Sequence, residues 1–523
     1  MPKLFINNRE INVQENTTLL EAAESMGLSI PTLCYLKNYS HFTSCMLCVV
    51  LDKKNNSLVP ACSMIAEEGM EIETEGHKIK TARKDTIDML LSEHVGDCEA
   101  TCTIGCPANM DIPLMIRQIK EMKFDEAIKS VKNDIALPAI LGRICSAPCE
   151  NACYHKLYDT PVSICELKRI VADLDLEKEN PYTPEIEKLT DKKIAVIGAG
   201  PTGLSTSYYL QRLGHQVTLY DKFEKPGGMM QYGVPAERLD KAVLANEIKQ
   251  ILRLGIQFIG KSELGGNLNL DELINNYDAV VLAIGTIDKE NIKLPGLELS
   301  YKGVAVDKKT FQSNIGKVFA GGNTIRSGRS TIRSCAHGKL MAQSVHAYLL
   351  GSEPNLVDKR FNSTIGRIKK EEIPELIKGS EPHQRILPEG GKKTGYTIPE
   401  SIKESERCFR CDCRKKNNCK LRDYADLFQG NQKRYKITDR IKFKKIIQHD
   451  NVIYEPGKCI KCNICVQITE KAEENLGLTM INRGFDITIA VPFNDSFSNG
   501  LKKVSKEVVE NCPTAALSFI NEI

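Results

Sequence analysis

Cysteine distribution constrains this chain more than any other feature. The 523 residues include 20 cysteines and no tryptophan, and 19 of the cysteines fall within residues 34–62, 98–165, 408–419 and 459–512. Between residues 166 and 407 there is only Cys335. In a reducing compartment thiols rarely persist as disulfides, so grouped cysteines indicate metal or iron–sulfur centres. The sequence therefore predicts cysteine-bearing modules on both sides of a domain of another kind.

Length and charge set the other limits. At ~100–200 residues per domain, we expect about three to four domains. The 71 Lys and Arg residues against 67 Asp and Glu residues leave a formal net charge of +4, too balanced for a nucleic-acid or membrane-surface protein. No apolar run approaches ~18 residues, which argues against a membrane span, and the first residues do not form a signal peptide. We therefore expect a cytoplasmic protein that binds neither nucleic acid nor membrane.

Residues 1–80 are predicted to form a small domain with one metal centre. Two short alternating stretches flank Asn7-Asn8 like the strands of a hairpin, and Thr18 is the expected cap of a helix that ends near Gly27. A C-x10-C-x2-C-x13-C spacing follows, which suits an iron–sulfur cluster or a four-cysteine zinc site. The segment resembles the ferredoxin-like [2Fe–2S] domain of complex-I-type NADH dehydrogenases and iron hydrogenases. This resemblance implies a β-grasp fold with a [2Fe–2S] cluster on Cys34, Cys45, Cys48 and Cys62.

Residues 81–188 carry two further cysteine stretches, joined by apolar residues at helical spacing. The segment resembles the helical domain of the small subunit of bacterial glutamate synthase and of dihydropyrimidine dehydrogenase. The resemblance implies two [4Fe–4S] clusters with interleaved ligands: Cys98, Cys102 and Cys153 on one, and Cys106, Cys145 and Cys149 on the other. His94 and Cys165 are the nearest candidates for the two remaining ligands. A surface or helix histidine and a buried structural thiol are the alternatives for these two residues.

Residues 189–352 are predicted to bind a dinucleotide. A strand is followed by Gly198-x-Gly200-x-x-Gly203, and a second strand ends at Asp221. The glycines permit a tight turn, close approach to a pyrophosphate and close helix packing, while the carboxylate suits a ribose hydroxyl. The flanking motifs resemble glutamate-synthase-type flavoproteins, which implies FAD, with Asn323 where that family has an aspartate. The implied FAD-binding residues are Gly198, Gly200, Pro201, Gly203, Asp221, Lys222, Gly228, Met229, Tyr232, Gly233, Gly285, Gly322, Asn323 and Ala336.

A second dinucleotide domain is expected to be absent. In the glutamate-synthase-type flavoproteins, an NADPH-binding domain is inserted between the two halves of the FAD domain. Here Leu294-Pro295-Gly296 resembles the start of that insert, and residues 304–311, about a dozen positions on, resemble the sequence after it. The comparison implies that about 150 residues, one domain's worth, are missing. It also implies that the chain does not oxidise NAD(P)H by itself.

The last third combines a connector with two cysteine groups. Residues 353–430 begin as proline- and glycine-rich chain, predicted to be extended. They end with Cys408, Cys411, Cys413 and Cys419, a set that suits zinc and an iron–sulfur cluster equally. Residues 431–523 resemble the ferredoxin region of complex-I-type and hydrogenase subunits. That resemblance implies one [4Fe–4S] cluster, with zinc as the alternative metal, on Cys459, Cys462, Cys465 and Cys512.

Together these segments predict a multidomain α/β and α+β protein. It would contain a β-grasp [2Fe–2S] domain, a helical domain with two [4Fe–4S] clusters, a Rossmann-like FAD domain and a C-terminal ferredoxin-like domain. The expected function is an electron-transfer subunit of a multi-subunit oxidoreductase, with no catalytic residue identified. The implied partners are an NADH dehydrogenase-like flavoprotein, a hydrogenase, a formate dehydrogenase or ferredoxin. The alternatives are a self-sufficient NAD(P)H:acceptor oxidoreductase and a structural assembly subunit with a degenerate flavin site. Electron bifurcation is compatible with the pattern, which does not establish it.

Overall fold

The structure is a computed structural model that describes residues 1–40, 42–287, 294, 296–354, 360–435 and 440–520. Packing divides the chain into two compact units. The first comprises Met1–Ala100, Lys359–Gly379 and Cys411–Ile523, and the second comprises Thr101–Asp358 and Ser380–Arg410. Each unit is therefore assembled from segments far apart in the sequence, and the segment predicted as one connector, 353–430, contributes to both.

The first unit begins with a mixed five-stranded sheet in the order β2-β1-β5-β3-β4. Its strands are β1 (Lys3–Ile6), β2 (Arg9–Asn12), β3 (Val49–Asp52), β4 (Ser57–Pro60) and β5 (Glu71–Glu73), and only β1 and β5 run parallel. The predicted hairpin is confirmed, because Asn7 and Asn8 adopt φ values of 50° and 62° between β1 and β2. The predicted helix is also confirmed: α1 (Leu19–Ser25) is capped by Thr18 in a capping box with Glu21.

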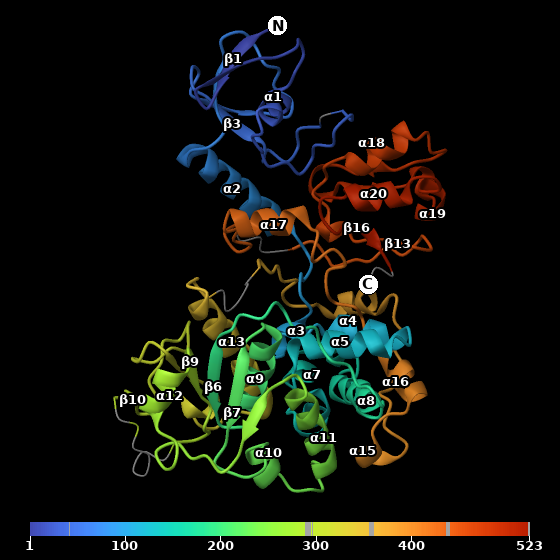
Figure 1. The fold of residues 1–523 in the computed structure, drawn as a ribbon. Coiled ribbons are helices and arrows are strands. Elements are labelled where there is room, and N and C mark those ends of the chain that lie inside the picture. The colour runs from blue at the N-terminus through green and yellow to red at the C-terminus, as the bar shows by residue number, and fades with distance from the viewer. Residues whose placement is uncertain (41, 288–293, 295, 355–359, 436–439, 521–523) are drawn as a thin grey trace. The chain divides into compact units, whose positions relative to one another are not determined.

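The rest of the first unit is helical around two small antiparallel sheets. Helix α2 (His77–Glu93) follows the first sheet, and α17 (Lys420–Leu427) packs beside it (Figure 1). The C-terminal segment pairs β13 (Val452–Tyr454) with β16 (Leu517–Phe519), and β14 (Thr479–Ile481) with β15 (Thr488–Ala490). Its helices are α18 (Ile464–Lys471), α19 (Phe497–Gly500) and α20 (Ser505–Asn511). A continuous apolar core joins these elements to the loop that carries Cys34 and Cys45.

The second unit starts with a helical layer. Its helices are α3 (Thr101–Gly105), α4 (Ile112–Lys120), α5 (Phe124–Asp134), α6 (Pro138–Ile144), α7 (Pro148–Ala152) and α8 (Ile164–Leu176). Figure 1 shows α16 (Ile398–Ser405), from much later in the chain, beside α8. The connector predicted to be extended thus contains helices, namely α14 (Ile373–Ile377), α15 (Gly391–Thr394) and α16. A capping box of Thr397 and Glu400, with a proline in the first turn, starts α16.

The second unit also contains a wholly parallel sheet in the order β12-β9-β6-β7-β8. The strands are β6 (Lys193–Ile197), β7 (Gln216–Tyr220), β8 (Gln257–Ile259), β9 (Ala279–Leu282) and β12 (Val318–Ala320). Helices α9 (Pro201–Arg212) and α13 (Thr331–Leu349) pack together beside it, and α10 (Met229–Tyr232), α11 (Lys241–Leu252) and α12 (Leu270–Asn276) follow the strands (Figure 1). This arrangement confirms a mixed α/β, multidomain protein with a Rossmann-like sheet.

The remaining elements are short. Between β9 and β12 the described residues form only the two-residue strands β10 (Leu299–Ser300) and β11 (Gly303–Val304), and Pro295 of the predicted deletion point lies outside the described residues. The 3-10 turns are η1 (Tyr154–Leu157), η2 (Gly322–Thr324), η3 (Lys370–Glu372), η4 (Pro456–Lys458), η5 (Gly484–Asp486) and η6 (Pro492–Asn494). Within the described ranges, every helix is too short or too polar to cross a bilayer.

Candidate functional site: a dinucleotide cradle and grouped thiols

The loop after β6 forms a tight cradle that only glycine permits. Gly198 has a φ of 105°, and a Cβ atom on Gly203 would lie 1.8 Å from the Gly198 carbonyl oxygen. A Cβ on Gly228 would lie 2.8 Å from the Cα of Gly200, so the two backbones approach closely. Gly200 is the N-cap of α9, and no side chain caps that helix. The free N–H groups of the first turn therefore suit a pyrophosphate.

Asp221 binds the cradle to the end of β7. Its Oδ2 accepts a hydrogen bond from the Ala199 N–H at 2.6 Å, and its Oδ1 accepts one from the Phe223 N–H at 2.9 Å. The carboxylate is buried, and each oxygen retains a second lone pair. Lys222 lies on the exposed loop that follows, Met229 and Tyr232 are the exposed first and last residues of α10, and Gly233 is the C-cap of that helix. The predicted FAD-binding residues of the first half thus gather around one loop and one strand end.

The second half of the predicted flavin site meets the first at α9. A Cβ on Gly322 would lie 2.2 Å from Oγ1 of Thr202, in the first turn of α9. The Asn323 side chain accepts the Arg329 N–H at 3.1 Å, so the residue that replaces an aspartate holds the next loop in place. Gly285, with a φ of 83°, follows β9, and Ala336 is buried in α13. The residues present fit a bound dinucleotide.

A cationic cavity lies next to this site. It measures about 390 Å³ and is lined by Ser146, Gly328, Ser327 and Ser330, together with Arg326, Arg329 and Arg333. The described residues place no carboxylate in contact with these arginines, and the Nε of Arg329 is buried without a hydrogen-bond partner. Because Ser146 directly follows Cys145, the cavity adjoins a cysteine group and suits an anionic ligand.

The four cysteines of the N-terminal domain form one group. Hydrogen bonds from the Cys45 and Cys62 thiols lower the pKa of Cys34, and the hydrogen bond to Cys34 in turn raises the pKa values of Cys45 and Cys62. A hydrogen bond with Cys62 lowers the pKa of Cys48. All four side chains are buried. The sequence set is therefore brought together on one loop and one strand end.

A second group surrounds a buried lysine in the second unit. Burial lowers the pKa of Lys168, but the thiols of Cys165, Cys145, Cys149 and Cys106 raise it overall. The Lys168 ammonium lies 4.0 Å from the Cys165 sulfur, and a hydrogen bond with Cys165 raises the pKa of Cys145. These are the three cysteines grouped by resemblance, plus the candidate Cys165. A buried lysine among four thiols is the counter-charge that an anionic cluster needs.

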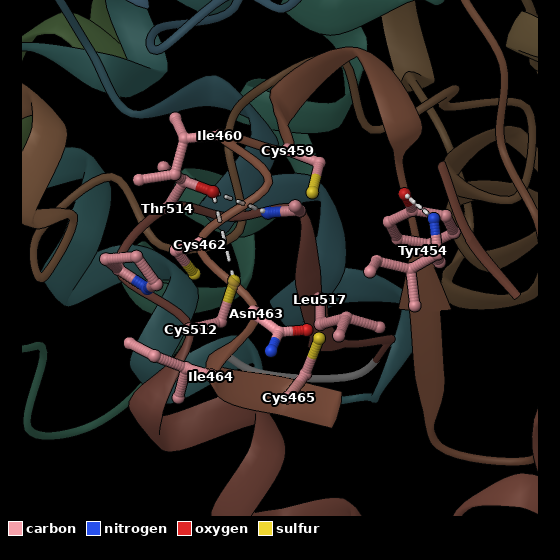
Figure 2. A pocket seen from close by; sticks show the side chains of 13 residues that line it. Tyr454, Cys459, Ile460, Cys462, Asn463, Ile464, Cys465, Cys512, Thr514 and Leu517 are labelled. Carbon is pink, nitrogen blue, oxygen red and sulfur yellow. Dashed lines mark hydrogen bonds between the residues drawn. The ribbon is translucent and has the colours of Figure 1, made fainter. Parts of the chain in front are cut away.

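Figure 2 shows the third group, in which Cys459, Cys462, Cys465 and Cys512 line one small cavity of about 20 Å³. Lys461 and Asn463 adopt φ values of 57° and 67°, which turns the C-x2-C-x2-C loop around the cavity. The rest of the lining is mostly apolar, with Tyr454 on one side. The pKa of Cys465 is raised well above its usual value by burial and by the other three thiols.

The other predicted ligands are divided between the two compact units. Cys98 lies in the first unit, whereas Cys102, Cys153 and Cys408 lie in the second. The Cys413 N–H donates to the Cys98 carbonyl at 3.0 Å. Burial raises the pKa of Cys419 to about 12, together with the nearby thiols of Cys413 and Cys98. Cys98 therefore lies near Cys413 and Cys419, although more than 300 residues separate it from them in the sequence.

His94 ends α2 with its Nδ1 buried and without a hydrogen-bond partner. Burial and then Lys458 lower its pKa to about 4. Lys458 also lowers the pKa of Cys413, against a larger rise from burial. Cys411, also in the first unit, raises the pKa of Lys445 against a larger lowering by burial.

In the part of the chain that the structure describes, no group of three or more His, Cys, Asp or Glu side chains is arranged to bind a single metal ion.

Lys168 and Lys458 are features that the sequence analysis did not identify. Both are buried, and lysine is almost never fully buried unless it is paired. Lys168 follows Cys165 by three residues, one helical turn, and Lys458 directly precedes Cys459. Their proximity to cysteines is the only local signal available.

Three family models match successive parts of the chain. Residues 2–77 match a 2Fe-2S iron-sulfur cluster binding domain, residues 90–180 match dihydropyrimidine dehydrogenase domain II with its 4Fe-4S cluster, and residues 170–341 match the pyridine nucleotide-disulphide oxidoreductases. The matches support [2Fe–2S] and [4Fe–4S] domains and a flavin-type dinucleotide domain, and they fit an FAD- and iron–sulfur-containing oxidoreductase subunit.

Similar proteins are subunits of redox enzymes. The chain is 36% identical over 208 residues to the beta subunit of the NADPH-Fe(3+) oxidoreductase of Geobacter sulfurreducens, covering 39% of this chain and 31% of that protein. It is 30% identical to the small chain of NADPH glutamate synthase from Bacillus subtilis, covering 50% and 56%. It is 36% identical to the PreT subunit of the NAD-dependent dihydropyrimidine dehydrogenase of Salmonella typhimurium, covering 36% and 46%. The chain therefore spans about a third to a half of these relatives.

Solved structures overlap only with small parts of the chain. An NAD+-reducing [NiFe]-hydrogenase chain shares 26% identity at a TM-score of 0.18, covering 20% of this chain and 42% of that one. A thioredoxin reductase from Gloeobacter violaceus shares 11% identity at a TM-score of 0.22, covering 32% and 97%. These scores are too low to relate the folds.

Proposed function

We propose that this chain is an FAD- and iron–sulfur-dependent electron-transfer subunit of a multi-subunit cytosolic oxidoreductase. One observation carries the proposal: a single chain combines a glycine cradle for a dinucleotide with three separate groups of four thiols. A purely structural subunit has no need of three sets of four thiols, each gathered at one place, whereas an iron–sulfur cluster is held by four such ligands.

We assign a [2Fe–2S] cluster to the β-grasp domain through Cys34, Cys45, Cys48 and Cys62. Two [4Fe–4S] clusters are assigned to the groups of Cys106, Cys145, Cys149 and Cys165 and of Cys459, Cys462, Cys465 and Cys512. The thiolates hold iron, and Lys168 offsets the charge of its cluster, which stabilises the more negative, reduced form.

The flavin site is assigned to the cradle of Gly198, Gly200 and Gly203. FAD supplies the exchange between two-electron and one-electron transfer. The first turn of α9 binds the pyrophosphate with its free N–H groups, and Asp221 holds the ribose side of the loop. The arginines 326, 329 and 333 place positive charge beside the cluster-bearing segment at Ser146, where negative charge on a reduced cofactor is stabilised.

The partners are proposed from the same features. The described residues between β9 and β12 form no second dinucleotide domain. We therefore infer that this chain exchanges electrons with other subunits, such as an NADH dehydrogenase-like flavoprotein, a hydrogenase or a formate dehydrogenase, or with ferredoxin. The names of the similar subunits, from an NADPH-Fe(3+) oxidoreductase and a dihydropyrimidine dehydrogenase, support a role within a larger enzyme.

Anaerobic purification of the full chain tests the proposal. We expect one flavin and at least about ten irons per chain for one [2Fe–2S] and two [4Fe–4S] clusters. Dithionite should bleach the flavin and the clusters, whereas NADH and NADPH should bleach neither in the isolated chain. Stoichiometric bleaching by NADPH would show a self-sufficient reductase, and a colourless protein with about two irons or fewer would contradict the electron-transfer role.

A further inference from the structure

We infer that the first unit holds one further [4Fe–4S] cluster, bound by side chains from two distant parts of the sequence: His94, Cys98, Cys413 and Cys419. This inference rests on the proposed function and regroups cysteines that the family resemblance and the sequence spacing assign to two different sites. The main observation in its favour is that the segment after α2 packs against the segment before α17.

The backbone contact comes first. The Cys413 N–H donates to the Cys98 carbonyl at 3.0 Å, and the Cys98, Cys413 and Cys419 side chains are each less than a tenth exposed. The Cys98 sulfur accepts the Ser363 N–H at 3.4 Å and lies 3.2 Å from the Ser363 hydroxyl oxygen. Hydrogen bonds to cysteine sulfur tune the potentials of iron–sulfur clusters. The contacts of the Cys98 sulfur with Ser363 are of this kind.

Helix packing brings His94 to the same place. Lys84 and Asp88 of α2 bind the backbone of Gln429 and Asn431, just beyond the C-terminal end of α17, both at 2.6 Å. The other end of α17, where Cys419 is the N-cap, therefore lies toward the C-terminal end of α2, where His94 follows. Its buried, unpartnered Nδ1 is a group that a metal would satisfy. An imidazole can replace a thiolate as a cluster ligand.

Three largely buried cations, Lys415, Lys458 and Arg414, lie around this position. The Lys415 ammonium is buried and bonds to three backbone carbonyls, those of Val509, Glu510 and Cys512, at 3.0, 3.4 and 2.8 Å. Lys458 and Arg414 share the single carboxylate of Glu455, at 2.7 and 3.3 Å. Buried cations require paired negative charge. A thiolate-bound cluster between these cations supplies it.

Four ligands complete the inferred cluster, so Cys102, Cys153, Cys408 and Cys411 stand outside its ligand set. Of these, Cys102, Cys153 and Cys408 lie in the second unit.

The inferred cluster is placed to relay electrons. The Cys419 thiol donates to the Pro513 carbonyl at 3.9 Å, and Pro513 follows Cys512 of the C-terminal cluster group. One electron passes at a time, so that one cluster is oxidised as its neighbour is reduced, and no bond is made or broken.

Paired substitutions in the anaerobically purified full chain test the grouping. We expect Cys98→Ser to lose about four irons per chain, the content of one [4Fe–4S] cluster. The double variant Cys98→Ser/Cys413→Ser should lose no more, whereas Cys98→Ser/Cys102→Ser should lose more iron than Cys98→Ser alone, because Cys102 lies outside the inferred ligand set. Cys335→Ala, at the one cysteine outside all groups, should lose none. Additive loss in the first pair, or equal loss in the second, would overturn the inference, as would bound zinc that Cys98→Ser removes without loss of iron.

A separate EPR measurement tests whether His94 is a cluster ligand. With ¹⁵N-labelled histidine, pulsed EPR of the reduced chain should show nitrogen coupling to one cluster, and His94→Cys should abolish the coupling while keeping the iron. Absence of this coupling in the unsubstituted chain would overturn the assignment of His94. These EPR measurements do not require the double cysteine variants to fold. Retained flavin and [2Fe–2S] signals alongside a failed regrouping would leave the proposed function standing, whereas their absence would remove that function as well.

Discussion

At the residue scale, Gly203 is fixed by the geometry of its own loop. Because a Cβ atom there would lie 1.8 Å from the Gly198 carbonyl oxygen, Gly203→Ala has to displace the turn or the start of α9. We expect flavin affinity to weaken at least about tenfold, or about 1.4 kcal/mol. Flavin content of the purified protein, followed by titration of the flavin-stripped protein with FAD, measures the effect.

Gly316→Ala is the matched control, since a Cβ on Gly316 meets nothing within 4 Å. This variant should keep its flavin. Similar losses in both variants would show that the cradle geometry around Gly203 does not determine flavin binding.

His215 makes the stability of the second unit depend on pH. It is fully buried, with its Nε2 2.8 Å from Nδ1 of His346 and its Nδ1 2.6 Å from the Thr190 hydroxyl oxygen. Burial and then His346 lower its pKa to about 4, against ~6.5 for an unfolded histidine. The folded state therefore binds fewer protons than the unfolded state between these values, and stability falls as the pH drops below about 6.5.

We expect this unit to lose about 2 kcal/mol of unfolding free energy between about pH 7.5 and pH 5 from His215 alone. His215→Gln should remove that part of the pH dependence. Thermal unfolding of both proteins across this range, followed by flavin release, measures the difference. Parallel pH profiles for the two proteins would contradict the assignment to His215.

At the scale of elements, α8 places a ligand and its counter-charge on one face. Cys165 and Lys168 are one turn apart, and the lysine ammonium lies 4.0 Å from the sulfur. Lys168→Met keeps most of the buried volume but removes a cation that favours the more negative, reduced cluster. We expect the reduction potential of this cluster to fall by about 60 mV, equivalent to about 1.4 kcal/mol for one electron. EPR-monitored redox titration measures it, with Lys129→Met on the exposed face of α5 as the control. An unchanged potential in Lys168→Met would contradict the role.

Elements with local signals could be predicted from the sequence, and contacts between distant segments could not. The hairpin at Asn7-Asn8, the cap at Thr18 and the glycine turn after β6 are each specified by a few adjacent residues. The contact between Cys98 and Cys413 depends on how α2 packs against α17, which no short pattern encodes. The family resemblance groups Cys98 with Cys102 and Cys153, and spacing groups Cys413 and Cys419 with Cys408 and Cys411. Neither signal encodes a contact between Cys98 and residues more than 300 positions away in the sequence.

At the scale of the whole molecule, both compact units are discontinuous in sequence. The first is built from the N-terminal segment, a short middle segment and the C-terminal segment. The first unit therefore cannot complete its folding until the C-terminal residues are present. Long-range contacts of this kind slow folding. Two units with separate cores are also expected to unfold in separate transitions, because two-state behaviour holds for single domains.

Two equivalent capping boxes test this separation, one in each unit. In α1 the Thr18 hydroxyl accepts the Glu21 N–H at 3.2 Å, and in α16 the Thr397 hydroxyl accepts the Glu400 N–H at 3.4 Å. Replacing either threonine by alanine should cost about 1 kcal/mol. Thr18→Ala should increase amide hydrogen exchange only in the first unit, and Thr397→Ala only in the second, as read by mass spectrometry of peptides from each unit. If either variant destabilised both units to the same extent, the chain would unfold as one cooperative body, because a local loss then lowers the stability of every segment equally.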